Sequence, residues 1–217
     1  MNCENSGCAG GSLPRYKVSI HGGILAVHLE LVSRDPAATV FLDRDGVLNR
    51  RIVGGYVTDW SQFELLPGVK DAMKKLARSG FRTVIVSNQA GVAKGQLTCN
   101  TLLHLTMKSF DEFHRLGATV AGAFFCLHQP SDNCSCRKPM PGLLQKAMRD
   151  VPFDPEQSFF VGDSASDIQA GAAVGLQTVA LTEDLGDLKA TKCVKDLLSA
   201  VDWILAQTAR LGRDLPR

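Results

Sequence analysis

Short apolar runs alternate with longer amphipathic segments from residue 38 to near the end of the chain. The apolar runs predict buried strands over 39–42, 82–86, 120–127, 158–161 and 177–181. The amphipathic segments predict helices over 69–78, 98–116, 142–150, 167–174 and 194–205. This alternation predicts an α/β fold in which a doubly wound parallel sheet carries helices on both faces, joined by right-handed crossovers.

The first 37 residues lack this regularity. Residues 1–14 are rich in Gly, Ser, Asn and Cys without periodicity, so we expect a mobile tail there. Residues 16–32 carry apolar positions that fit either a strand or a short helix, and the sequence leaves this choice open. We therefore divide the chain into a partly disordered N-terminal extension, 1–37, of undetermined role, and one globular domain, 38–217.

The composition is that of an ordinary soluble protein. Of the 217 residues, 45% are hydrophobic and 21% charged, and the net charge of +2 does not favour a nucleic-acid binder. No apolar stretch approaches the roughly 20 residues that span a bilayer. The apolar start of 23–32 is short and lacks the pattern of a signal peptide. We therefore expect a cytoplasmic protein that binds neither nucleic acid nor membranes.

Polar side chains follow four of the predicted strands. Asp43, Ser87 and Asp163 each come at the end of an apolar run, and a loop rich in Cys and His follows the third strand. In an open parallel sheet, ligands bind outside the carboxyl ends of the strands. Four strand ends would therefore deliver reactive groups to one edge.

Each of these motifs has an ordinary structural explanation when it is taken alone. Asp43-Arg-Asp45-Gly46 would make a turn after a strand, and Gly162-Asp163 to Asp167 would cap a helix. Lys138 would be a solvated surface side chain. Their order along an alternating chain is much harder to obtain by accident, and it therefore favours a catalytic site.

This order resembles the haloacid dehalogenase-like phosphatase superfamily, from about Val40 to Leu181. Further segments are similar to the subgroup that contains the heptose bisphosphate phosphatases and the histidinol-phosphatases. These segments are Phe41 to Leu48, Gly55-Tyr-Val57, Pro67-Gly-Val69, Ser87-Asn-Gln89, Gly91 to Gly95 and Cys136-Arg-Lys-Pro139.

The resemblance implies a phosphoric monoester hydrolase that acts through an aspartyl phosphate. Asp43 would attack phosphorus, and Asp45 would protonate the leaving oxygen and then deprotonate water. Lys138 and Ser87 would stabilise the phosphoryl oxygens.

The resemblance also implies a magnesium ion. Its ligands would be Asp43, the backbone carbonyl of Asp45, and Asp163. Asp167 would orient Lys138 or a metal-bound water rather than bind the metal. The chain departs from the subgroup at Ser164, where lysine is often found, so no substrate phosphate is assigned to that position.

The loop after the strand predicted over 120–127 offers four soft metal ligands within eleven residues: Cys126, His128, Cys134 and Cys136. Three thiolates and one imidazole match tetrahedral structural zinc, and the subgroup has a zinc site at this place. The alternative is a buried Cys126 with loose surface thiols. An odd count of seven cysteines also favours metal binding in a reducing compartment over a disulfide framework. We expect zinc to position Lys138, which lies two residues after Cys136.

The chain leaves no room for a separate cap domain, so polar groups around the cleft must select the substrate. The candidates are Arg51, Asn88, Gln89, Lys94 and Arg137. Arg137 is the best of them, since a guanidinium suits a distal phosphate. For Arg51 and Lys94, simple solvation is an equal alternative.

The substrate implied by the resemblance is a sugar phosphate, with D-glycero-D-manno-heptose 1,7-bisphosphate losing its 7-phosphate in nucleotide-activated heptose and lipopolysaccharide biosynthesis. The alternative within enzymes is histidinol phosphate. A 3′-phosphatase acting on nucleic-acid ends is a more distant one, disfavoured by the modest charge. From another class, the chain could be an inactive zinc-stabilised binding module, although the intact catalytic set argues against this. We expect a monomer, and the anomer preferred stays open.

Overall fold

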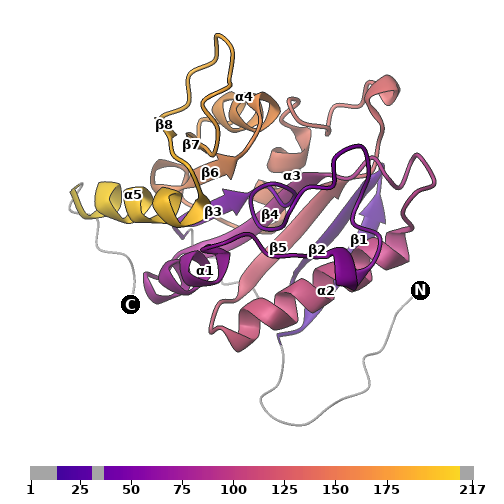
Figure 1. The fold of residues 1–217 in the computed structure, drawn as a ribbon, viewed down its shortest axis with the longest axis horizontal. Helices are drawn as coiled ribbons and strands as arrows, with labels where there is room; N and C mark the ends of the chain where they lie inside the picture. The colour runs from indigo at the N-terminus through magenta and orange to yellow at the C-terminus, as the bar shows by residue number, and fades with distance from the viewer. Residues whose placement is uncertain (1–13, 31–36, 211–217) are drawn as a thin grey trace.

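The computed structural model describes residues 14–30 and 37–210. In this part of the chain the strands form one sheet in the order β1-β2-β5-β4-β3-β6-β7-β8 (Figure 1). The strands are β1 (Tyr16–His21), β2 (Ile24–Leu29), β3 (Thr39–Leu42), β4 (Arg82–Asn88), β5 (Val120–Cys126), β6 (Phe159–Gly162), β7 (Gln177–Ala180) and β8 (Lys192–Cys193). The helices are α1 (Val69–Arg78), α2 (Cys99–Arg115), α3 (Gly142–Asp150), α4 (Ala165–Ala173) and α5 (Leu197–Arg210).

The predicted fold class is confirmed. The strands from β5 to β8 pair in parallel, and β3, which carries the first motif, lies between β4 and β6. A buried parallel strand needs an apolar run, and all four residues of β3 are buried.

An antiparallel hairpin extends this sheet at one edge. The strand alternative for residues 16–32 is the one that forms, as β1 and β2, and β2 pairs antiparallel with β5. The boundary at residue 37 stays a prediction. The mobile tail expected over 1–14 lies outside the described residues except for Pro14.

Helices cover both faces of the sheet, and each face has its own core. On one face, α1, α2 and α5 pack side chains such as Leu76, Phe113 and Ile204 against the sheet. On the other face, α3 and α4 contribute Leu144 and Ala170 (Figure 1). The doubly wound arrangement leaves the carboxyl ends of the strands free for loops that carry function.

The largest differences from the pattern along the chain concern the last helix and the last strand. The last helix was expected over 194–205 but runs from Leu197 to Arg210, because Asp196 accepts a hydrogen bond from Ser199 N at 2.8 Å and caps its start. The two-residue strand β8 was not predicted, since such a short element has no periodicity.

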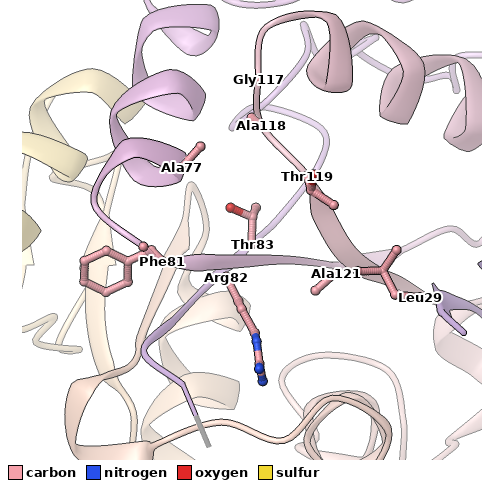
Figure 2. A pocket seen from close by; sticks show the side chains of 10 residues that line it. Leu29, Ala77, Phe81, Arg82, Thr83, Gly117, Ala118, Thr119 and Ala121 are labelled. Atoms are coloured by element: carbon pink, nitrogen blue, oxygen red, sulfur yellow. The ribbon is translucent and has the colours of Figure 1, made fainter. Parts of the chain in front are cut away.

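A cavity of about 320 Å³ lies at the opposite edge of the sheet, near the amino ends of β4 and β5. Figure 2 shows it between Ala77, Arg82 and Thr119. Arg82 is the one charged side chain among the described residues that line it, and its Nη1 donates to the Pro152 carbonyl at 2.6 Å. None of the predicted site residues reaches this cavity.

Candidate active site

Two neighbouring strands, β3 and β6, and the helix α4 that follows β6 bring three carboxylates to one edge of the sheet. Asp43 directly follows β3 and Asp163 directly follows β6, while Asp167 lies in the first turn of α4. The Asp43 amide donates to the Val161 carbonyl at 3.0 Å, which continues the β3–β6 ladder into the loop. One oxygen from each of the three carboxylates lies within 4.8 Å of the other two.

A buried lysine lies inside this cluster. The Lys138 ammonium is 3.0 Å from Oδ1 of Asp43 and 2.6 Å from Oδ1 of Asp167, and it donates to the Val86 carbonyl at 2.8 Å. Its side chain is 2% exposed. Burial opposes the charge on Lys138, but Asp167 and Asp43 outweigh this and raise its pKa. A buried cation is tolerated when it is paired in this way.

The carboxylates nevertheless lack positive charge. Burial raises the pKa of Asp43, with Lys138 lowering it and Asp167 raising it. Burial, followed by the charge of Asp43, raises the pKa of Asp163 to about 6 even though Arg51 lowers it. One lysine and one arginine therefore do not fully balance the negative charge of the three carboxylates. This excess of negative charge on oxygen ligands fits a hard divalent cation.

Asp167 uses its two oxygens within the protein. Oδ1 faces Lys138, and Oδ2 accepts from Ser164 Oγ at 2.6 Å and Ser164 N at 3.1 Å. The serine that replaces the subgroup's frequent lysine thus caps α4 together with Asp167. This geometry agrees with a role in orienting Lys138.

The Asp45 carboxylate turns away from the cluster. It accepts from Arg44 Nη2 at 2.8 Å, from Gln89 Nε2 at 2.7 Å and from Asn49 Nδ2 at 2.9 Å. Burial works against its charge, but Arg44 and the hydrogen bonds from Asn49, Arg44 and Gln89 outweigh this and lower its pKa. Asp45 is therefore ionised and firmly oriented in the free protein.

Two of these partners, Arg44 and Asn49, were not among the predicted site residues. Arg44 is 3% exposed and Asn49 is fully buried. The sequence could have indicated Arg44, because it lies between two aspartates at the end of a buried strand. Asn49 gave no signal, since its contact with Asp45 depends on how the loop turns.

Arg51 occupies the position at which a metal was expected. Its Nη2 is 2.7 Å from Asp163 Oδ1 and 3.2 Å from the Asp45 carbonyl oxygen. Gly46 lies against the same carboxylate, and a Cβ there would be 1.9 Å from Asp163 Oδ2. A cationic group of the protein therefore meets two of the predicted magnesium ligands, which shows that these oxygens suit a cation.

The loop after β4 is turned toward the protein. Asn88 accepts from Lys138 N at 3.1 Å and donates to the Lys138 carbonyl at 3.0 Å. Gln89 is fully buried and donates to Asp45 and, at 3.3 Å, to the buried Ser87 hydroxyl. Ser87 lies at the carboxyl end of β4, whereas the Asn88 and Gln89 side chains are engaged with Lys138 and Asp45.

The remaining substrate candidates are less enclosed. Lys94 Nζ lies 5.7 Å from the centre of the Tyr56 ring, a cation–π distance. Arg137 Nη1 donates to the His128 carbonyl at 3.2 Å, so its position depends on the Cys/His loop.

The four predicted zinc ligands converge. Cys136 Sγ is 3.3 Å from Cys126 Sγ, 3.5 Å from Cys134 Sγ and 3.3 Å from His128 Nδ1. Cys126 Sγ is 3.6 Å from His128 Nδ1 and 3.7 Å from Cys134 Sγ. Ligands of a tetrahedral zinc with Zn–S bonds of about 2.3 Å are about 3.7 Å apart. The donor atoms and their spacing therefore fit zinc.

Comparison with known proteins agrees with this geometry. The haloacid dehalogenase-like hydrolase family matches residues 28–175. A D-glycero-beta-D-manno-heptose-1,7-bisphosphate 7-phosphatase of Yersinia pestis is 35% identical over 185 residues, covering 82% of this chain and 93% of its own. A D-glycero-alpha-D-manno-heptose-1,7-bisphosphate 7-phosphatase of Mycobacterium bovis is 40% identical over 151 residues, covering 64% and 77%.

The fold has solved counterparts as well. The D,D-heptose 1,7-bisphosphate phosphatase of B. bronchiseptica, complexed with magnesium and phosphate, superposes with a TM-score of 0.71. It is 29% identical, and the match covers 78% of this chain and 98% of that one.

Proposed function

The chain belongs to the haloacid dehalogenase-like hydrolases and is a phosphatase, and we propose that it removes the 7-phosphate of D-glycero-D-manno-heptose 1,7-bisphosphate. The observation that carries the catalytic part is the buried Lys138, paired with Asp43 and Asp167 among three carboxylates at one strand edge. The substrate rests on the names of relatives at 35% and 40% identity.

In this proposal Asp43 is the nucleophile. A carboxylate oxygen forms a bond to phosphorus as the bond from phosphorus to the sugar oxygen breaks, giving an aspartyl phosphate and an alkoxide. Water then attacks phosphorus, inorganic phosphate leaves, and the Asp43 carboxylate is restored. The rigid start of the loop supports this role, because the Asp43 amide is tied to β6.

Asp45 moves the protons. It gives a proton to the departing alkoxide and later takes one from the attacking water. Its low pKa means that it carries no proton in the free protein. An arriving phosphate dianion raises the pKa of a neighbouring carboxyl, so we expect Asp45 to become protonated as the substrate binds.

Positive charge and hydrogen-bond donors surround the transferring group. Lys138 stabilises the charge on the phosphoryl oxygens, and the Ser87 hydroxyl donates to one of them. Asp167 and Asn88 hold the lysine from its side chain and from its backbone.

The oxygens of Asp43, Asp163 and the Asp45 backbone carbonyl would hold magnesium. The bound ion supplies the positive charge that lets a carboxylate approach a phosphate. With the ion bound, Arg51 would leave these oxygens and could then meet the second phosphate together with Arg137.

The Cys/His loop would hold zinc in a structural role. With four protein ligands the site has no open position for a substrate or water, so the metal fixes the loop rather than taking part in the reaction. Cys136 lies two residues before Lys138, so a loop without its metal would misplace both Lys138 and Arg137.

The substrate would enter an open cleft. Between β3 and α1 the described chain carries a short 3-10 helix, Trp60–Gln62, and no separate cap domain. Arg51, Lys94 and Arg137 would then select the substrate from the surrounding loops, whereas Asn88 and Gln89 act mainly by holding catalytic groups.

No helix in the described ranges, 14–30 and 37–210, is long and apolar enough to cross a membrane. We propose a cytoplasmic monomer, because cysteines that bind a metal as thiolates, rather than forming disulfides, are typical of a reducing compartment.

The test compares two substrates. Phosphate release is measured with magnesium from heptose 1,7-bisphosphate and from histidinol phosphate, using the wild-type protein and Asp43→Asn. A strong preference for the bisphosphate, lost in Asp43→Asn, supports the proposal. Preference for histidinol phosphate overturns the substrate, and unchanged turnover in a folded Asp43→Asn variant overturns the mechanism.

A further inference from the structure

Most of the β1–β2 hairpin precedes the region that matches the family model, which begins at residue 28. It is nevertheless built into the sheet. Leu25, Ala26 and Val27 are buried, and β2 pairs with β5 along a register that sets Ile24 opposite Cys126. Ile24 also packs against the core that contains Cys126 and Cys136. The first zinc ligand of the loop is thus held by the hairpin.

The turn of the hairpin reaches the second ligand. Gly22 and Gly23 both have positive φ, 54° and 69°. The Gly23 carbonyl accepts a hydrogen bond from Leu127 N at 2.9 Å. A Cβ on Gly23 would be 2.1 Å from Cε1 and 2.3 Å from Nε2 of His128, so the backbone of the turn lies directly against the imidazole.

The Cε1–Nε2 side of the ring lies closest to the turn, and a Cβ on Gly23 would also be 2.9 Å from Nδ1. Nδ1 is at the same time the ring atom that faces the thiols. His128 Nδ1 is 3.3 Å from Cys136 Sγ and 3.6 Å from Cys126 Sγ. A histidine ligand needs a second contact that fixes the orientation of its ring. In this chain the glycine turn provides that contact through shape.

The same histidine touches the catalytic segment. Its carbonyl oxygen accepts from Arg137 Nη1 at 3.2 Å, and Cys136 precedes Arg137 and Lys138 in the chain. A displacement of His128 would therefore move the zinc ligands and the arginine together, next to the lysine that faces Asp43.

We propose that the β1–β2 hairpin is a positioning element for the catalytic edge, and that Gly23 is its critical residue. It holds the Cys126 and His128 donors in place for zinc, and the metal-bound loop in turn positions Arg137 and Lys138. This inference rests on the proposed zinc site and phosphatase mechanism, but not on the identity of the substrate.

The test uses two neighbouring glycines as a matched pair. Gly23→Ala and Gly22→Ala place an alanine at similar positive φ, so both strain the turn. A Cβ at Gly22 has no atom within 4 Å, whereas one at Gly23 meets His128. Zinc content of the purified full-length proteins, zinc release to a chromogenic chelator, and turnover of a generic phosphate ester with magnesium are measured for both.

We expect Gly23→Ala to release zinc at least tenfold faster than Gly22→Ala, and its kcat to fall in parallel with zinc loss. Gly23→Ala with His128→Cys should recover zinc retention, because cysteine is a smaller ligand that leaves room for the new methyl group. Equal zinc release in the two single variants would overturn the proposal.

Two further results would also overturn it: a wild-type protein that purifies without zinc, or a double variant without recovery. Recovery separates the contact with His128 from strain in the turn. Zinc release is measured without substrate, so a failure of heptose bisphosphate as substrate would be seen separately.

Discussion

Arg51 and Asp163 form an ion pair in which the guanidinium Nη2 lies 2.7 Å from the carboxylate Oδ1. The same nitrogen is 3.2 Å from the Asp45 carbonyl oxygen. The Arg51 side chain is 51% exposed and the Asp163 side chain 16% exposed, and ion pairs with a solvent-exposed partner contribute about 1 kcal/mol or less. The pair can therefore open readily, and the protein's own cation competes with magnesium for these oxygens.

Removing this competitor should strengthen magnesium binding. We predict that Arg51→Ala lowers the magnesium Kd by up to about fivefold, the equivalent of about 1 kcal/mol, in calorimetry without substrate. Arg50→Ala is the matched control, since Arg50 pairs with exposed Glu64 at 2.8 Å and should leave the Kd unchanged. Weaker magnesium binding in Arg51→Ala would show that the arginine supports the site instead.

The role of Asp45 can be tested through the leaving group. Asp45→Asn should slow hydrolysis of an alkyl phosphate by about 10²–10⁴-fold, because an alkoxide needs a proton as it departs. A nitrophenolate leaves without one, so the loss on p-nitrophenyl phosphate should be much smaller in the first step, measured as the burst. Equal losses in that step would contradict proton donation by Asp45.

Lys138 should matter for stability as well as for turnover. Lys138→Met leaves Asp43 and Asp167 buried without their cation, which we expect to cost about 3–5 kcal/mol of unfolding free energy in denaturant titrations without magnesium. Lys70→Met is the control, because the Lys70 side chain is 54% exposed in its pair with Glu112 and its loss should cost about 1 kcal/mol or less.

The cost of Lys138→Met should also depend on pH. Burial already raises the pKa of Asp43, and loss of Lys138, which lowers it, raises it further. The folded variant then binds more protons than the unfolded chain, so its stability falls as pH rises. The deficit relative to wild type should be larger at pH 8 than at pH 5. A deficit independent of pH would mean that lost packing is responsible.

Loss of one zinc ligand should lower metal retention and activity together. We predict that Cys134→Ser purifies with substoichiometric zinc and reduced kcat, whereas Cys193→Ser, at an exposed position far along the chain, keeps both. Zinc content is measured by atomic spectroscopy on the same samples used for the assay. Full activity in a zinc-free Cys134→Ser protein would refute a structural role for the metal.

The local pattern along the chain was sufficient for the parallel part of the fold apart from the two-residue strand β8. A buried strand such as β3 shows itself as an apolar run, and an amphipathic helix such as α1 shows itself by its period, since both depend on neighbours in sequence. Strand ends then located Asp43, Ser87 and Asp163, because parallel strands expose their carboxyl ends at one edge.

Contacts between distant segments could not be predicted from the hydrophobic pattern along the sequence. The orientations of Asn88 and Gln89 toward Lys138 and Asp45, and the ion pair between Arg51 and Asp163, are set by how the loops pack. Residues 16–32 fitted two kinds of structure until β2 paired with β5. Strand pairing depends on a partner about a hundred residues away, and propensity at one position carries no information about it.

The sequence by itself therefore determined the class of fold, the motifs and the chemistry that their residue types permit. Only the tertiary structure decided which side chains face one another, which carboxylates lack compensation, and that Gly23 lies against His128. The physical reason is that residue identity and period act locally along the chain, whereas burial, electrostatic pairing and close contact arise when distant segments pack.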